Sequence, residues 1–249
     1  MKILKKIGIV LFWLIIWQII AIIIHNDILF AGPFQTITSL VKMSKDTIFF
    51  DSVLSSYLHI MAGILAGVLG GTLLGSLSYK YKILDEFLSP IVLMIKAVPV
   101  ASFVVLVLIW IGNSNLSTVI SALVVFPIVY TSVLTGLRSR ATKLIEMAYV
   151  YRMPMFNQIR YIYIPLVLPV FKNAIALSVG MGFKSGVAAE VIGQPISSMG
   201  NGLYNAKIYL DTGELFAWTA VIVLVSWITE KVITLLLNVF CGKGAVNDN

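Results

Sequence analysis

The chain has 249 residues, of which 59% are hydrophobic and only 12% are charged. Soluble domains carry roughly 25% charged residues, so this composition excludes an ordinary soluble protein and indicates a chain whose main solvent is lipid. A net charge of +7 would suggest nucleic acid as a partner of a soluble protein, but here the basic residues gather between apolar runs, which is the pattern that sets membrane orientation.

Six apolar segments approach or exceed the roughly 20 residues that a helix needs to cross a bilayer. In chain order they are 7–24, 57–78, 86–111, 116–137, 165–190 and 215–239. The first could be a cleaved secretory signal, because it follows a basic stretch. However, the run has 18 residues and no small-x-small cleavage site follows it, which favours a retained helix. The sequence therefore predicts an all-α integral membrane protein, a six-helix bundle.

Lysine and arginine are distributed unevenly over the segments that join these spans. With the N-terminus inside, the inside segments hold 11 of the 18 basic residues and the outside segments hold three. Those three are Lys42, Lys45 and Lys207, and four more lie within spans. This positive-inside bias predicts that both termini are cytoplasmic.

Two outside connections are expected to contain short helices. In the first, residues 25–56, a Gly-Pro break precedes apolar positions at near-helical spacing, which predicts a surface helix within 34–50. The second, residues 191–214, is rich in glycine and predicts irregular chain followed by a short helix near 203–210.

Glycines recur at every fourth residue along the second span, at Gly63, Gly67, Gly71 and Gly75. At 3.6 residues per turn they form one stripe along the helix. Because glycine has no side chain, another helix can approach closely there. We interpret the stripe as a packing surface within the bundle and not as a substrate site.

The longest inside segment, residues 138–161, is basic but also carries a regular set of apolar residues. These are Leu144, Ile145, Ala148, Val150, Met153, Phe156 and Ile159. Two short helices joined by a turn fit this pattern, with Pro154 in the first turn of the second helix. An apolar surface that faces the cytoplasm implies a docking partner. The alternative is that these side chains pack back on the chain's own helix ends.

Within this segment, Glu146-Met-Ala148-Tyr-Val-Tyr-Arg152 is followed nine residues later by Ile162-Tyr-Ile164-Pro165. The pattern resembles the EAA motif of binding-protein-dependent ABC importer permeases, which runs Glu-Ala-Ala, three residues, glycine, nine residues, Ile-x-Leu-Pro. The spacing agrees throughout, while Met147 and Arg152 depart from the motif in kind. If the turn needs left-handed backbone at Arg152, a non-glycine residue costs on the order of 1 kcal/mol.

Two more segments resemble the nitrate, taurine and sulfonate subgroup of these permeases. Lys96-Ala-Val-Pro99-Val-Ala-Ser, ending in Trp110-Ile-Gly112, is similar to its Arg-x-Ile-Pro-x-x-Ala…Trp-Phe-Gly stretch. Phe183-Lys184-Ser-Gly-Val-Ala-Ala189-Glu190-Val-Ile-Gly193 is similar to its Trp-Lys-x-x-x-Ala-Ala-Glu-x-x-Gly segment.

The resemblance implies the membrane-spanning subunit of an ATP-driven importer with the type I permease fold, located in a bacterial cytoplasmic membrane. Such permeases pair, dock on two cytoplasmic ATPase subunits and receive solute from an outer binding protein. The second permease could be another copy of this chain or a sister permease. The residues that it implies for coupling to the ATPase are Glu146, Ala148, Arg152, Ile162, Ile164 and Pro165.

This reading divides the chain into an N-terminal helix with its outer connection, residues 1–56, a transporter core, residues 57–240, and a cytoplasmic tail, residues 241–249. The sequence contains no GxxxxGK[ST] phosphate loop. ATP and Mg²⁺ are therefore expected on the partner subunits, and no cofactor and no catalytic residue are expected in this chain. One cysteine and two histidines predict no metal site.

Three charged residues are predicted within or near spans, where a central lysine costs roughly 2.5–3.5 kcal/mol. Lys184 either faces the translocation path, which would suit an anionic solute, or is a structural lysine bonded to a carbonyl or a carboxylate. Glu190 is expected to pair across an interface or to shape an outer gate. Lys96 can extend its amine toward the inner surface or, with the neighbouring Pro99, belong to the path.

Two other classes of protein also consist largely of membrane spans. A secondary transporter or channel subunit explains the spans and their charges but not the patterned loop at 138–161. An integral membrane enzyme needs clustered His, Asp or Cys at one membrane face, and the sequence has no such cluster. The solute stays open between an anion and a neutral or cationic vitamin precursor.

Overall fold

The computed structural model describes residues 2–26, 28–139 and 141–240, and the regular structure in these ranges is entirely helical. Five helical segments are long and apolar enough to cross a membrane. They contain α1 (Lys2–Ile24), α3 (Thr47–Lys80), α6 (Leu116–Arg138), α9 (Ile164–Gly193) and α11 (Thr212–Phe240). A sixth candidate is a bent pair, α4 (Lys82–Ala97) and α5 (Val100–Ile111). The all-α class predicted from the sequence is confirmed.

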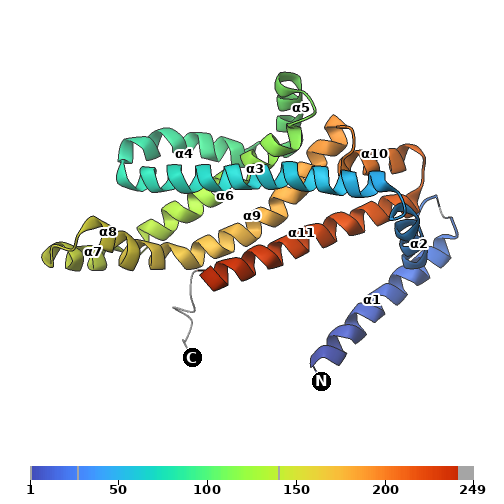
Figure 1. Cartoon of the computed structure of the whole chain (residues 1–249), viewed down its shortest axis with the longest axis horizontal. Helices are drawn as coiled ribbons and strands as arrows, with labels where there is room; N and C mark the ends of the chain where they lie inside the picture. The colour runs from blue at the N-terminus through green and yellow to red at the C-terminus, as the bar shows by residue number, and fades with distance from the viewer. Residues whose placement is uncertain (1, 27, 140, 241–249) are drawn as a thin grey trace.

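The short helices lie at opposite ends of the bundle (Figure 1). One end carries α2 (Pro33–Met43) and α10 (Met199–Ile208). The other carries α7 (Ala141–Val150) and α8 (Met155–Gln158), and α8 continues through a π-helix, η1 (Ile159–Tyr163), directly into α9. These are the short helices expected in the two outside connections and in the long inside segment.

The segment 86–111 is not the single continuous span that the sequence predicts. It divides into α4 and α5, whose axes are inclined by 105°. Val98 adopts extended backbone, with φ −76° and ψ 133°, because the residue before a proline is driven out of the helical region. Pro99 then precedes the first residue of α5. The pair is a broken span or a re-entrant turn, so the sixth predicted span is bent and not one continuous helix.

Two helical segments begin earlier than predicted. The side chain of Asp46 accepts a hydrogen bond from the Ile48 amide at 3.1 Å and so caps α3. From there α3 runs unbroken through the boundary that we placed after residue 56. The helical run that ends as α9 likewise begins at Met155, ahead of the expected residue 165.

The glycine stripe of α3 lies directly on α6. Each glycine meets a backbone carbonyl, and these carbonyls also recur at every fourth residue, at Thr118, Ala122, Phe126 and Tyr130. A Cβ added at Gly71 would lie 2.9 Å from the Phe126 oxygen, and one added at Gly75 would lie 3.0 Å from the Tyr130 oxygen. Small residues therefore bring these two backbones into contact, as in other closely packed membrane helices.

The helix α9 completes this core on the other side. Gly182 and Gly186 pack against Ile64 and Ile60 of α3. The Ser121 hydroxyl of α6 donates to the Gly182 carbonyl at 3.0 Å. The three helices α3, α6 and α9 therefore form one tightly packed body. The helix α1, by contrast, diverges from it in Figure 1, and no described residue of its apolar stretch is fully buried in the single chain.

Candidate functional site

Large apolar and aromatic side chains are exposed along α7 and α8. They include Tyr149, Val150, Tyr151, Met155, Phe156 and Ile159. Tyr149 and Phe156 are 84% and 72% exposed, respectively. Ala148 is buried and Met153 is half-buried, so the predicted apolar pattern divides between an inward and an outward side. An exposed apolar surface of this kind marks an interaction site.

The end of α7 has the geometry that the motif's glycine position suggests. Arg152 lies in the left-handed region, with φ +48°. The Met153 amide donates to the Ala148 carbonyl at 2.8 Å, and the Arg152 amide donates to the Tyr149 carbonyl at 3.0 Å. This pair of bonds is the Schellman arrangement, in which glycine usually takes the left-handed position. The turn is thus built as a glycine turn would be, with arginine in the strained position.

The predicted coupling residues are placed in two environments. Glu146 is exposed on α7, whereas Ala148 and Ile162 are buried where α7 packs against η1. Ile164 and Pro165 are exposed at the start of α9. The Ile164 amide reaches back to the Ile159 carbonyl, which is the wide spacing of a π-turn. Because proline removes an amide donor and crowds the carbonyl four residues earlier, this wide turn accommodates Pro165 without ending the helix.

An ion pair ties α4 to α6 at the end of the bundle that carries α7 and α8. Arg138 Nη2 lies 2.6 Å from Asp85 Oδ2. The Tyr130 hydroxyl lies 3.3 Å from the same carboxylate and 3.0 Å from Ser78 Oγ of α3. The sequence reasoning missed this connection, since it counted Arg138 only among the basic residues of the inside segments and gave Asp85 no role.

Lys184 faces away from the core of the chain. It lies on a stripe of α9 whose members are exposed at helical spacing: Leu177, Met181, Lys184 and Ala188. The opposite side of the same helix holds Phe183 and Val179, which are fully buried. The side chain of Lys184 is therefore available for contact with a group outside this chain's packed core.

Lys96 and Pro99 lie at the bend between α4 and α5. Both are exposed, and Lys96 Nζ donates to the Thr131 hydroxyl of α6 at 3.2 Å. Lys96 is also in the last turn of α4, where a cation is favoured by the helix dipole. These contacts support a structural role for Lys96 in holding the bend against α6.

Glu190 is buried in a hydrogen-bonded network at the end of the bundle that carries α10. Its Oε2 accepts from Ser56 Oγ at 2.7 Å and from the Gly200 amide at 3.1 Å. Ser56 in turn accepts from the Met199 amide at 2.8 Å. Ser56 and the carboxylate thus accept the first two amides of α10, where the helix dipole also favours an anion. A side chain at Gly200 would collide with Glu190, so the close approach needs glycine.

Ser56 was not among the predicted residues, although a signal for it was present. It lies near the continuation of the glycine stripe, one turn from Ile60, and the adjacent Ser52 is buried as well. Extending the stripe of small residues toward the start of α3 would have identified a small polar position facing α9 and α10.

These features define a multispanning membrane protein with a packed helical body, an exposed helix–turn–helix at one end and an ordered polar network at the other. The chain belongs to the family of binding-protein-dependent transport system inner membrane components, whose model matches residues 59–240. The match confirms the resemblance to ABC importer permeases, which carry no ATPase site.

Two relatives show a more distant similarity. One, from Bacillus subtilis (strain 168), is named as the aliphatic sulfonates transport permease protein SsuC. It is 29% identical over 156 residues, which cover 62% of this chain and 56% of that protein. The riboflavin transport system permease protein RibX of Chloroflexus aurantiacus is 28% identical over 160 residues, which cover 64% of this chain and 56% of that protein. The aligned region spans little more than half the length of these relatives.

Proposed function

We infer that this chain forms half of the translocation path of an ATP-driven importer and that α7 and α8 dock on a cytoplasmic ATPase subunit. The observation that carries this proposal is the apolar surface on α7 and α8, exposed beside a turn that has left-handed backbone at the motif's glycine position. A channel or a secondary transporter has no need of such a surface.

The distribution of charge supports the orientation. Lys80, Lys82, Arg138, Arg152 and Arg160 belong to the end of the bundle that carries α7, and an excess of basic residues identifies the cytoplasmic side. We therefore place α7 and α8 inside, with both termini on the same side. The helices α2 and α10 then face the outer binding protein.

A second permease would complete the path. The exposed stripe of α9 around Lys184 and the bent pair α4–α5 present apolar surface that this chain does not cover. We propose that two copies of this chain pair through these surfaces and bind two ATPase subunits, in the arrangement of a six-span type I permease. Coupling would run through Glu146 and the buried contact of Ala148 with η1 toward α9.

The charges beside the proposed path favour an anionic solute. Lys184 is exposed on α9, whereas the intramembrane carboxylate of Glu190 is buried and already engaged by α10. A path with an exposed cation and its carboxylate withdrawn favours negative charge. The relative named for sulfonates is consistent with this class, while the relative named for riboflavin keeps a vitamin-type solute as the alternative.

The docking proposal is tested by co-expressing the chain with candidate ATPase subunits from the same genome and purifying the permease. We expect the ATPase to co-purify and its activity to respond to the binding protein with solute. A permease that conducts solute when reconstituted without any ATPase would instead establish the channel or secondary-transporter alternative.

The role of Lys184 is tested by Lys184→Met, with Lys231→Met as the matched control because Lys231 is also exposed but lies on α11. For an anionic solute we expect uptake and solute-stimulated ATPase activity to fall about tenfold, which corresponds to about 1.4 kcal/mol. The control should transport normally. Unchanged uptake by Lys184→Met at matched expression would remove this lysine from the path.

A further inference from the structure

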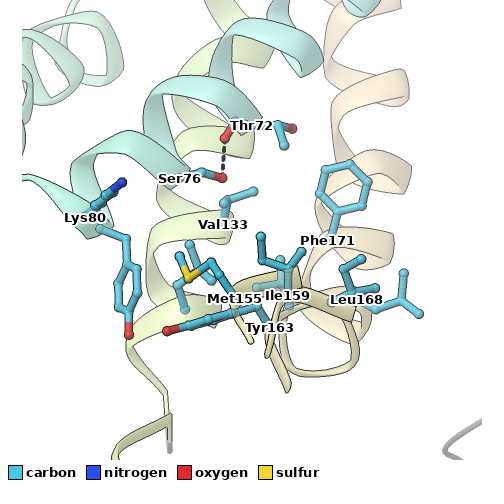
Figure 2. Close-up of a pocket in the computed structure, with 13 residues that line it drawn as sticks. Thr72, Ser76, Lys80, Val133, Met155, Ile159, Tyr163, Leu168 and Phe171 are labelled. Carbon is cyan, nitrogen blue, oxygen red and sulfur yellow. Dashed lines mark hydrogen bonds between the residues drawn. The ribbon is translucent and has the colours of Figure 1, made fainter. Parts of the chain in front are cut away.

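A groove of about 550 Å³ opens between the coupling segment and the packed body of the protein. One wall comes from the last turns of α3 and α6, and the other comes from α8, η1 and the start of α9. Figure 2 shows Lys80 at one edge of this groove and Phe171 and Leu168 at the opposite edge. Its volume is in the range that holds a small organic molecule or part of a larger one.

The walls of the groove are largely apolar, and they offer few polar groups to a bound molecule. Val133, Ile159, Leu168 and Phe171 are among the residues that line it. Besides the phenols of Tyr79 and Tyr163, two hydroxyls line the groove, and both of these are already engaged. Thr72 donates to the Val68 carbonyl at 2.7 Å, and Ser76 donates to the Thr72 carbonyl at 2.7 Å (Figure 2). The groove thus offers contact to hydrocarbon and few free donors to a polar solute, which argues against its being the solute path.

The charged side chain that lines the groove is a cation. Lys80 is the last residue of α3, is exposed, and forms no salt bridge among the residues that the structure describes. The lining residues include no aspartate and no glutamate. The rings of Tyr79 and Tyr163 meet edge to face beside it, with centroids 5.9 Å apart. Tyrosine and lysine side by side are typical of a helix end at the membrane–water interface.

We propose that this groove binds an anionic phospholipid of the inner leaflet, with an acyl chain between the two walls and the headgroup phosphate at Lys80. The placement in the inner leaflet rests on the orientation given above. The apolar walls account for the chain. Lys80 at the rim, whose amine lies 5.4 Å from the centre of the Tyr81 ring and has no carboxylate partner among the described residues, accounts for the charge of the headgroup. Basic pockets between helices on the cytoplasmic side are known to recognise lipid headgroups in this way.

A lipid in this position would touch both a fixed and a transmitting part of the protein. The wall from α3 and α6 belongs to the pair whose backbones meet at the glycine stripe. The wall from α8, η1 and α9 is continuous with the proposed ATPase-docking surface. The lipid would therefore brace the coupling segment against the body of the transporter.

The test measures which lipids stay bound to the purified permease–ATPase complex by native mass spectrometry. The complex is incubated with phosphatidylglycerol or phosphatidylcholine of identical chains, and with palmitate as a chain that lacks a phosphodiester. We expect phosphatidylglycerol to be retained about fivefold over phosphatidylcholine, the preference that one basic residue near a membrane surface supplies.

Three variants localise the binding. Lys80→Gln should lose the preference for phosphatidylglycerol, and Leu168→Trp, which fills the groove, should lose retention of both phospholipids. Lys82→Gln is the matched control because Lys82 is basic and exposed two residues away but does not line the groove. It should behave as the unchanged protein does.

Several results would overturn the proposal. They are equal retention of the two phospholipids, retention of palmitate equal to that of phosphatidylglycerol, an unchanged preference in Lys80→Gln, or unchanged retention in Leu168→Trp. Exclusion of lipid by a second copy of the chain, detected by cross-linking through Ile159→Cys, would also overturn it. Because retention is measured without transport, its failure leaves the importer function standing.

Discussion

The contact between α3 and α6 and the exposed pair α7–α8 use small and large residues in opposite ways. Along α3, glycines bring two backbones together and leave no room for a side chain. Along α7 and α8, aromatic side chains extend from the surface and touch little of the chain itself. This difference shows which surfaces are covered within the single chain and which are not. The α3–α6 body is closed within the chain, whereas α7–α8 needs another surface to cover it.

The largest effect should come from disrupting the contact between α3 and α6. Gly71→Ala places a Cβ 2.9 Å from the Phe126 carbonyl oxygen, and overpacking of this kind costs about 1–3 kcal/mol. Gly71→Leu should prevent assembly altogether. We expect a lower midpoint of thermal unfolding and loss of the monodisperse peak in size-exclusion chromatography.

The neighbouring glycine provides the control for that experiment. A Cβ at Gly70 would lie 3.6 Å from the Phe126 ring, an ordinary contact, and alanine is the better helix former by about 1 kcal/mol. Gly70→Ala should be as stable as the unchanged protein or slightly more so. Equal stability of Gly71→Ala would show that the α3–α6 contact is looser than the structure has it.

A loss smaller than that of Gly71→Leu is expected from the network around Glu190, which closes the end of the body opposite α7–α8. Glu190→Ala removes the acceptor of Ser56 and of the Gly200 amide, and hydrogen bonds to a charged group contribute about 1.5–3 kcal/mol each. We expect about 3 kcal/mol of destabilisation, together with faster hydrogen exchange at the start of α10. Glu86→Ala removes an exposed carboxylate and should change neither quantity. Protected amides at the start of α10 in Glu190→Ala would contradict the network.

Substitutions on the exposed surface of α7 and α8 should change binding to a partner without changing the stability of the permease. Phe156 is 72% exposed, so Phe156→Ala should leave the stability of the permease within about 0.5 kcal/mol. If this ring anchors the docking surface, the binding free energy for the ATPase should weaken by about 2 kcal/mol. Surface plasmon resonance with the purified subunits measures this change. Phe34→Ala, equally exposed on α2, should bind normally. Loss of stability in Phe156→Ala without loss of affinity would place the ring in the fold and not in an interface.

The sequence predicted those features that depend on local pattern and missed those that depend on contact between distant segments. Apolar length located the spans, and the apolar pattern of residues 138–161 predicted the short helices α7 and α8. The bond between Ser56 and Glu190 joins residues 134 apart, and neither helical periodicity nor motif spacing carries that information. The 105° bend before α5 was likewise not predicted, because a proline indicates where a helix ends but not the direction in which the chain continues.

The smallest effect is expected at the turn between α7 and α8, where the backbone at Arg152 is strained. Arg152 has φ +48°, and left-handed backbone costs a residue with a side chain roughly 1 kcal/mol. Arg152→Gly should remove that cost and slow hydrogen exchange in the last turn of α7, since glycine favours the Schellman arrangement already present. Tyr151→Gly, one residue earlier, should speed the same exchange, because glycine weakens a helix end that has no left-handed residue to accommodate. If both variants speed exchange, the arginine side chain contributes more to this turn than its backbone costs, and the departure from glycine at Arg152 is a stabilising feature of the coupling segment.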